Sequence, residues 1–408
     1  MSLQLRWVGQ DEMDRVAQMR MRCFAHAAKD LDRYREIIRA DVRAQPEDFL
    51  LAEREGEAVG TATALSMTMW VREGAVPCQG VAWVGTIKTH RRRTEGQDGI
   101  ATRVMRETLR MARERGQVVS ALMPFRASFY EHFGYGLVER RNDWTIPLAI
   151  LPKGDAGGIR FYRQDDLTEL VRFRQRVVER GQCDIERPRN AWEYALGLAE
   201  KGFVVVDRPE ADGPVRGYLF FEHATVGNLD HLKVTQIAYE DIAALKRQLH
   251  FLASLRDQYA AAVITLPVDV PLNWLLRETQ IPHRLVNHPA ADLRQYTRMQ
   301  LRVLDHKRLI EAMKFPSHMA GRVVVAVQEI EGHESRFAIE FSAGKAQVSA
   351  SSAAPGLDCP DRIWAPIVCG ELPATQAVEL GLAAGDEKAA QLLGIFSIGP
   401  TPFTTEYF

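Results

Sequence analysis

One stretch, Trp83 to Gly136, constrains what this chain can fold into more than any other. It begins as a strand, continues into a basic loop, and then carries apolar residues at the spacing of an amphipathic helix up to Arg115. Asp98 fits the N-cap of that helix and Gly116 fits its stop. A second apolar run and a tyrosine-bearing turn follow. This order of elements predicts an α/β fold in which a helix begins immediately after the basic loop.

The loop before the helix has the composition of an anion site. Arg91, Arg92 and Arg93 supply positive charge, while Gly96 and Gly99 let the backbone approach a ligand closely. The free backbone N–H groups of the first helical turn and the helix dipole favour negative charge at the same place. A diphosphate is the expected ligand. From these residues alone, an ordinary solvated loop is the alternative.

Two motifs in the stretch resemble a known family. Thr89-His-Arg-Arg-Arg93 is followed by Gly99-Ile-Ala101, and the turn reads Phe129-Tyr-Glu-His-Phe-Gly-Tyr-Gly136. These motifs resemble the GNAT acetyltransferases, and more narrowly the Eis (enhanced intracellular survival) family within them. The resemblance implies acetyl-CoA as cosubstrate. It assigns the cosubstrate to Val84, Gly85, Thr86, Arg91, Arg92, Arg93, Gly96, Gly99, Ile100 and Ala101.

The same resemblance assigns the chemistry to two residues. Tyr130 would be the general acid on the coenzyme A sulfur, and the C-terminal carboxylate of Phe408 would be the base or would orient a cationic amine. A thiol of pKa about 8.5 and a phenol near 10 make the proton transfer feasible, whereas a free α-carboxylate near 3.5 is a weak base unless burial or a water helps. A packing role is the alternative for Tyr130.

The loop also departs from the family pattern. Residues Thr94 to Asp98 stand between Arg93 and Gly99, where family members run directly into the glycine. Glu95 and Asp98 put negative charge beside the expected pyrophosphate. Two functions therefore stay open: an acetyl-CoA-dependent N-acetyltransferase, and a non-catalytic or weakly catalytic protein that binds a ligand or lipid on the same scaffold.

The composition of the chain limits its expected location and the kinds of partner it can bind. The 408 residues suggest roughly two to four domains, and 46% hydrophobic with 26% charged residues is typical of a globular protein. A formal net charge of -1 argues against a chain that coats nucleic acid or a membrane. The five cysteines lack C-x-x-C spacing, so we expect no metal site. No signal-peptide pattern or long apolar run is present, which predicts a cytoplasmic protein.

The rest of the chain predicts further domains. Phe203–Phe221 repeats the strand, turn and strand of Phe49–Leu65, but the later loop, Ala238–Ile242, has no glycine or arginine and should not cradle a diphosphate. After Gly321, strand-like runs precede helical runs, as in an α+β layer domain. We therefore expect a catalytic GNAT domain at 1–150, a degenerate GNAT-like domain at 151–297, and, from the resemblance, a sterol-carrier-like domain at 298–408.

The substrate and the assembly follow from the resemblance alone. It implies transfer to an amine of a small cationic molecule, aminoglycoside-like or polyamine-like, or to lysine, and it implies a homo-oligomer, a hexamer. Phe24, Met67, Met69 and Trp70 are candidates for an acceptor pocket, although such apolar residues are more often core.

Overall fold

The computed structural model describes residues 3–25, 30–91, 98–198, 202–281 and 288–408. The chain divides into two compact units. The first holds the chain up to Val138, together with Met299–Ile398 and Tyr407–Phe408, and the second holds Glu139–Arg298 and Gly399–Glu406. The predicted three-domain division at residues 150 and 297 stays a prediction.

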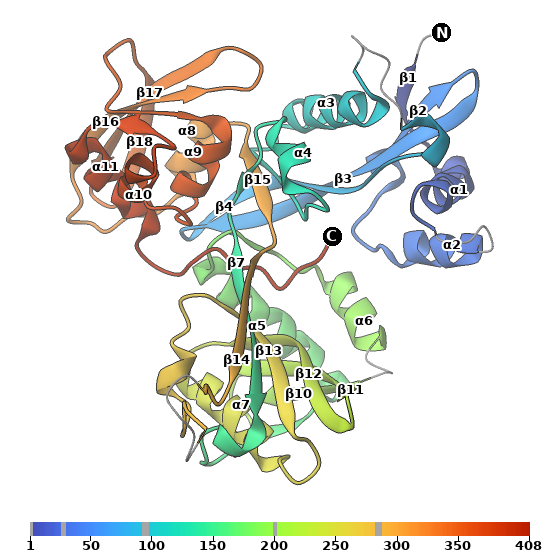
Figure 1. Cartoon of the computed structure of the whole chain (residues 1–408), viewed down its shortest axis with the longest axis vertical. Helices are drawn as coiled ribbons and strands as arrows, with labels where there is room; N and C mark the ends of the chain where they lie inside the picture. The colour runs from blue at the N-terminus through green and yellow to red at the C-terminus, as the bar shows by residue number, and fades with distance from the viewer. Residues whose placement is uncertain (1–2, 26–29, 92–97, 199–201, 282–287) are drawn as a thin grey trace. The chain divides into compact units, whose positions relative to one another are not determined.

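The first unit is built on a mixed sheet that runs in the order β1-β2-β3-β4-β5-β15-β6 (Figure 1). Strands β4 and β5 run parallel, whereas β2–β3 and β3–β4 are antiparallel hairpins. Glu55 and Gly56 turn the first hairpin with φ of 54° and 81°, which confirms the predicted turn. The strands are β1 (Gln4–Trp7), β2 (Phe49–Arg54), β3 (Glu57–Val71), β4 (Gly74–Thr86), β5 (Val119–Leu122), β15 (Gln300–Val303) and β6 (Gly136–Leu137).

The predicted helix is α3 (Ile100–Glu114), and Gly116 follows its end with φ of 65°, as expected of a helix stop. Asp98, however, is not its N-cap: the cap is Gly99, which offers no side-chain oxygen. Asp98 instead forms an ion pair with Arg106 in the second turn of the helix, so its carboxylate is drawn away from the capping position. The other helices of this part are α1 (Met13–Phe24), α2 (Leu31–Ala40) and α4 (Ala127–Glu131).

The second unit repeats this sheet in the order β14-β7-β13-β12-β11-β10-β8 (Figure 1). Its parallel pair is β12–β13, and the predicted strands around residues 203–221 are confirmed as β10 and β11. Its strands are β14 (Asp292–Thr297), β7 (Arg140–Pro147), β13 (Ala261–Pro267), β12 (Leu229–Tyr239), β11 (Gly217–Val226), β10 (Phe203–Asp207) and β8 (Ile159–Phe161). Its helices include α5 (Leu167–Arg180), α6 (Arg189–Leu198) and α7 (Ile242–Ser254).

One strand in each sheet comes from a distant part of the sequence. Strand β15 follows the long segment Glu139–Arg298 of the second unit in the chain, yet it pairs with both β5 and β6 of the first sheet. Strand β7 precedes the other strands of the second sheet and pairs there with β13 and β14. The equivalent position of each sheet, next to the second strand of the parallel pair, is thus filled by a long-range partner.

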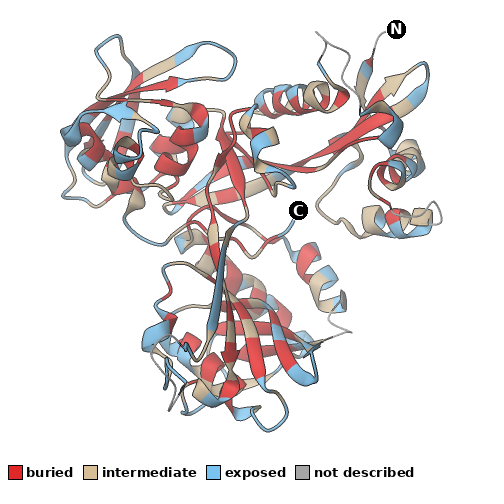
Figure 2. Cartoon of the chain, viewed as in Figure 1, coloured by how far each residue is buried: buried red, intermediate tan, exposed pale blue. Residues whose placement is uncertain are grey.

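The C-terminal part of the first unit has its own sheet, in the order β18-β17-β16-β19-β20. The predicted strands and helices are present, and an unpredicted strand, β19, pairs in parallel with β16. Trp364, Phe337 and Phe396 pack in its core, and buried residues fill the middle of each sheet (Figure 2). The elements are β16 (Gly321–Gln328), β17 (Glu334–Ser342), β18 (Lys345–Ala350), β19 (Leu357–Pro360), β20 (Ala384–Gly385), α8 (His306–Ala312), α9 (Asp361–Val368), α10 (Ala374–Glu379) and α11 (Glu387–Leu393).

None of the helices in the described ranges has both the length and the apolar character needed to cross a membrane.

Candidate active site

The candidate site lies where the parallel strands β4 and β5 part. Their register ends at Val81 and Leu122, and β4 continues alone against β3. Trp83, just beyond that point, has a positive φ of 54°, and the β3–β4 pairing shifts opposite it. The ring of Trp83 packs against Phe24 and lies under the guanidinium of Arg20, 4.5 Å away. The bulge therefore fixes the direction in which the last residues of β4 leave the sheet.

A cavity of about 340 Å³ occupies this opening. It brings together the predicted Val84, Gly85, Thr86, Arg91, Gly99, Ile100 and Ala101, and adds His90, Thr102, Phe125, Arg126 and Phe129. Arg92, Arg93 and Gly96 lie outside the described residues. Phe125 and Arg126 were not predicted as site residues; they directly precede the tyrosine turn, but no spacing rule connects them to the loop.

The N-terminus of α3 forms one wall of the cavity. Its cap, Gly99, is extended, with φ of -65° and ψ of 159°, and within the described part of the chain no side-chain hydrogen bond caps the first turn. Arg91 is held beside the end of β4 because its Nε donates to the Thr86 carbonyl at 3.3 Å. A helix end without a capping side chain, next to an arginine, leaves backbone N–H donors for an anion. The residues present therefore fit a diphosphate.

Close packing sets the position of α3 on the sheet. A Cβ added at Gly60 of β3 would lie 2.7 Å from Cγ2 of Ile100, the first residue of the helix. A Cβ added at Gly85 would lie 2.6 Å from Cζ of Phe24. Neither glycine can carry a side chain without moving a neighbour. Both glycines therefore allow Ile100 and Phe24 to pack closely on the strands at the cavity.

A second, larger cavity of about 620 Å³ adjoins the first and shares Gly99, Thr102, Arg126 and Phe129 with it. Its further lining residues are Asp98, Arg106, Ser128, His132 and Phe133. Arg126 donates to Oγ of Ser128 at 3.2 Å, and Nδ1 of His132 lies 2.7 Å from the Ser128 carbonyl oxygen. Together the two cavities form a continuous lining of basic and aromatic side chains along the start of α3.

Tyr130 lies on α4, with only 4% of its surface exposed. Its ring packs edge-on against Phe129 at 5.0 Å and Phe125 at 5.7 Å, and both of these rings line the first cavity. Burial raises the pKa of Tyr130 above its ordinary value. The phenol therefore stays protonated at neutral pH, as a proton donor must. Its catalytic role stays a prediction.

Phe408 lies over β4 at Gly80. A Cβ added at Gly80 would lie 2.6 Å from Cε of Met67 and 2.9 Å from Cδ2 of Phe408. Met67, one of the suggested acceptor-pocket residues, is thus beside the C-terminal residue. Met69 is fully buried, as the core alternative expects. Arg43 fixes the preceding residue by donating to the Tyr407 carbonyl at 3.3 Å.

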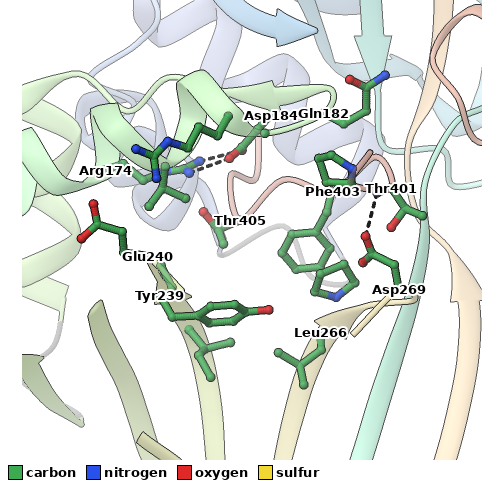
Figure 3. A pocket seen from close by; sticks show the side chains of 17 residues that line it. Arg174, Gln182, Asp184, Tyr239, Glu240, Leu266, Asp269, Thr401, Phe403 and Thr405 are labelled. Carbon is green, nitrogen blue, oxygen red and sulfur yellow. Dashed lines mark hydrogen bonds and ion pairs between the residues drawn. The ribbon is translucent and has the colours of Figure 1, made fainter. Parts of the chain in front are cut away.

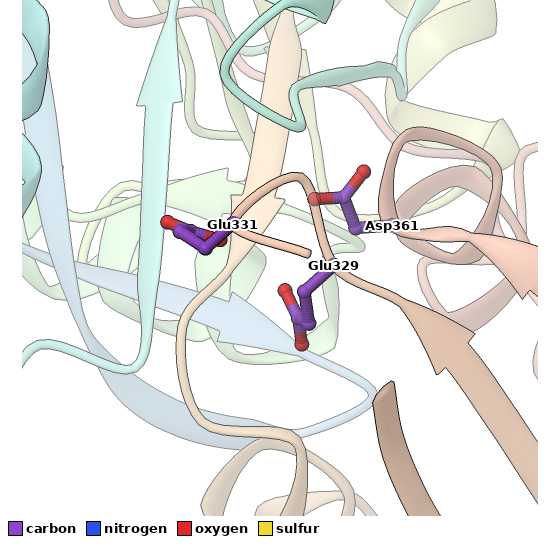
Figure 4. Close-up of side chains that lie close together, drawn as sticks. All are labelled: Glu329, Glu331 and Asp361. Carbon is purple, nitrogen blue, oxygen red and sulfur yellow. The ribbon is translucent and has the colours of Figure 1, made fainter. Parts of the chain in front are cut away.

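Three carboxylates, Glu329, Glu331 and Asp361, converge elsewhere in the first unit (Figure 4). Arg302, which is buried, lies 2.6 Å from Glu331, and Nε2 of His306 lies 2.9 Å from Glu329. Although burial opposes it, the contact with His306 lowers the pKa of Glu329. The carboxylates are balanced by these basic side chains, so we interpret the cluster as an ion-pair network within the fold.

Comparison with known proteins agrees with this geometry. The acetyltransferase (GNAT) domain is matched by residues 4–138, and again by residues 183–303. An uncharacterized N-acetyltransferase of Streptomyces avermitilis is 25% identical over 73% of this chain and 72% of its own length. Another, from Streptomyces griseus, is 24% identical over 86% of this chain and 87% of its own. The chain carries two tandem GNAT domains and is an N-acetyltransferase, for which these domains imply acetyl-CoA as cosubstrate.

Solved structures extend the likeness of fold to the whole chain. A GCN5-related N-acetyltransferase from Anabaena variabilis matches 100% of both chains with a TM-score of 0.85 at 19% identity. Eis1 from Mycobacterium abscessus matches 100% of both chains with a TM-score of 0.79 at 20% identity. At these identities the likeness establishes the mixed α/β fold, and it includes the third sheet.

Proposed function

We propose that this N-acetyltransferase moves the acetyl group of acetyl-CoA to an amine of a small cationic molecule, aminoglycoside-like or polyamine-like, or of a lysine side chain. The observation that carries the proposal is the N-terminus of α3, whose cap is a glycine and which lines one cavity together with Val84, Gly85, Thr86 and Arg91.

The proposed fit of the cosubstrate follows the chemistry of the walls. The backbone of Val84, Gly85 and Thr86 would bind the thioester carbonyl and pantetheine. The pyrophosphate would lie at Gly99, Ile100 and Ala101, with Arg91 beside it, because an uncapped helix end and an arginine both favour phosphate. Arg92, Arg93 and Gly96 belong to the same proposal on sequence grounds alone.

The larger cavity is the proposed place for the nucleotide end. Arg126 lines both cavities, so its guanidinium can serve a phosphate group near either. Phe129 and Phe133 offer aromatic faces, and His132 a further polar group, to a base and a ribose. Arg106 also lines this cavity, but its charge is already paired with Asp98. This pairing offsets part of the negative charge that the inserted loop brings.

Two groups would serve the transfer itself. Acetyl-CoA supplies the thioester: the amine nitrogen bonds to the acetyl carbon as the carbon–sulfur bond breaks, and the sulfur takes a proton from the Tyr130 hydroxyl. The buried position of Tyr130 supports this role because the phenol is kept protonated. The terminal carboxylate of Phe408 would attract and orient the cationic amine, while water removes the amine proton.

The rest of the chain is part of the proposal. We infer that the second GNAT domain is degenerate, that the C-terminal sheet region is a sterol-carrier-like domain, and that the protein works in the cytoplasm as a homo-oligomer, a hexamer by resemblance. Light scattering coupled to size exclusion tests the assembly: a mass near six times 46.0 kDa is expected, and a monomer would contradict it.

A thiol-release assay with acetyl-CoA and a panel of amines tests the function. The native chain should release coenzyme A with at least one polycationic amine. Adding two residues after Phe408 should lower kcat because it moves the carboxylate, while two residues added before Leu3 should not. If no amine in the panel supports turnover although acetyl-CoA binds, the proposed substrate class is wrong.

A further inference from the structure

A third cavity, of about 270 Å³, lies inside the second unit at the open end of its own parallel strand pair (Figure 3). The β12–β13 register ends at Val234 and Ile264, and the cavity begins beyond it at Ile237 and Leu266. It therefore occupies the same place in the second sheet that the candidate coenzyme cavity occupies in the first. The position alone makes it a candidate binding site, since ligands of open α/β sheets bind where parallel strands part.

The helix that follows β12 excludes a diphosphate from this cavity. The carboxylate of Asp241 caps α7 by accepting the N–H of Ala244 at 2.8 Å. Glu240 lines the cavity immediately before that cap. The Asp241 carboxylate occupies the position that a phosphate would need at the helix N-terminus. The Glu240 carboxylate beside it would repel a phosphate. The ligand of this cavity must be of a different charge class.

One wall of the cavity is the segment from Pro400 to Thr405. The Thr401 N–H donates to Oδ2 of Asp269 at 3.0 Å, and the Phe403 N–H donates to the Gln182 carbonyl at 2.9 Å. The segment is fixed further at Glu406, whose buried carboxylate lies 2.7 Å from the guanidinium of Arg187. Because these contacts hold the segment at three places, the wall of the cavity is formed before any ligand binds.

Most charged groups of the cavity lining are paired, and Arg180 of α5 also lines the cavity. Arg174 makes a two-pronged contact with Asp184 at 2.6 Å, and Glu240 is paired with Arg216 at 2.6 Å. Asp269, at the mouth, forms no ion pair with any basic side chain in the part of the chain that the structure describes. Figure 3 shows the Tyr239 hydroxyl directed toward the side of the cavity where Asp269 lies.

We propose that this cavity binds a small protonated amine on a compact apolar body. The ammonium would lie at the carboxylate of Asp269 and the hydroxyl of Tyr239, and the body would pack on Leu266, Ile237 and the ring of Phe403. The volume is slightly below the ~300 Å³ at which drug-sized pockets begin, so a ligand of one ring or a short chain fits. The site would give this enzyme an amine-binding function in addition to acetyl transfer.

Calorimetric titration of the full chain without acetyl-CoA tests the proposal. The probe is 2-phenylethylamine, and its neutral isostere 2-phenylethanol is the control ligand. Asp269→Asn keeps an acceptor for the Thr401 N–H and removes the charge, so it should weaken amine binding about fivefold, as expected of one partly exposed ion pair. Asp212→Asn, an exposed change away from the cavity, should leave binding as it is.

Hydrogen exchange locates the bound amine. Peptides that contain residues 400–405 should exchange more slowly with 2-phenylethylamine present, and Tyr239→Phe should reduce that protection. The proposal is overturned if the native chain does not bind the amine at millimolar concentration, if 2-phenylethanol binds equally well, or if Asp269→Asn binds the amine as tightly as the native chain. None of these results depends on whether acetyl transfer occurs.

Discussion

The two GNAT sheets of this chain have the same strand order and differ at one helix end. In both, a parallel strand pair parts and a helix begins after the first of the two strands. In the first, the cap of the helix is Gly99, which has no side chain, and Arg91 lies nearby. In the second, the cap is Asp241, whose carboxylate already takes a backbone N–H of the first turn.

The difference shows how a fold can be kept while its ligand changes. A glycine cap leaves N–H donors open and costs little helix stability, whereas an aspartate cap stabilises the helix and fills the anion position with its own charge. The cap residue, together with Arg91 at the first cleft and Glu240 at the second, therefore separates a cleft that fits a diphosphate from one that does not. The second cleft has an apolar lining and the Asp269 carboxylate at its mouth, and the proposed ligand there is a cation instead.

The largest change in kcat should come from replacing Tyr130. This residue belongs to the first cleft, where the acetyl transfer is proposed to take place. Tyr130→Phe should lower kcat by roughly 100-fold or more, the usual worth of a positioned general acid. The KM for acetyl-CoA should change little. Steady-state thiol release measures both.

Tyr135→Phe is the matched control for that change. Tyr135 is fully buried and its hydroxyl lies 2.7 Å from Oγ of Ser120, so its loss should cost about 1 kcal/mol of stability and leave kcat nearly native. Equal losses of kcat in the two variants would show that Tyr130 acts through packing rather than as an acid.

Transferring the second cap to the first cleft should remove most of the coenzyme affinity. Gly99→Asp would place a carboxylate at the N-terminus of α3, where it competes with the pyrophosphate for the same N–H groups. The loss of about 2 kcal/mol corresponds to a Kd for acetyl-CoA raised roughly 30-fold. Isothermal titration measures it.

Gly99→Ala separates charge from shape in that experiment. The residue has a negative φ of -65°, so alanine fits its backbone conformation. This variant should bind acetyl-CoA within about threefold of the native chain. Native affinity in Gly99→Asp would contradict the role given to the helix end.

Removing the cap residue of the second cleft should lower the stability of the protein and leave its affinity for acetyl-CoA unchanged. Asp241→Ala removes the cap of α7 and should lower the free energy of unfolding by about 1 kcal/mol. Asp241→Asn keeps an oxygen that can cap and should be close to native. Urea unfolding measures both, and a change of acetyl-CoA affinity in either variant would show that the second cleft does take part in coenzyme binding.

The smallest change is expected in the pH profile of kcat, which Tyr130 should not alter near neutral pH. Burial raises the pKa of Tyr130, so the phenol keeps its proton as pH rises and loses it only well above the ordinary value near 10. Between about pH 7 and 9.5, kcat should therefore not fall through loss of this proton. A falling limb in that range that is present in the native chain and missing in Tyr130→Phe would contradict the assignment.

Much of the local structure could be predicted from the sequence. Glycine-bearing turns between short apolar runs predict hairpins, as at Gly56, and helical periodicity predicts α3 up to Gly116. The partners of distant strands could not be predicted. Gln300–Val303 was not predicted as a strand, and nothing in its sequence shows that its neighbours are β5 and β6, because pairing across so many residues leaves no local signal.

The candidate site, like the local structure, could be predicted in part from the sequence. Residues near one another in the sequence, such as Val84 to Thr86 and Gly99 to Ala101, were found because they form a motif, and the structure brings both groups to one cavity. The cap was predicted wrongly as Asp98. A carboxylate one residue earlier is an equally good pattern, and only the ion pair with Arg106 decides between them. Arg126 was missed because no spacing rule connects it to the loop.

The most direct test of the comparison is the stoichiometry of acetyl-CoA binding to the native chain, measured by isothermal titration. The account predicts one molecule of acetyl-CoA per chain, bound at the cleft whose helix is capped by Gly99. Two molecules per chain would contradict it, since the cleft capped by Asp241 would then hold a diphosphate as well. No binding at millimolar acetyl-CoA would contradict it too, since the first cleft would then not be a coenzyme site.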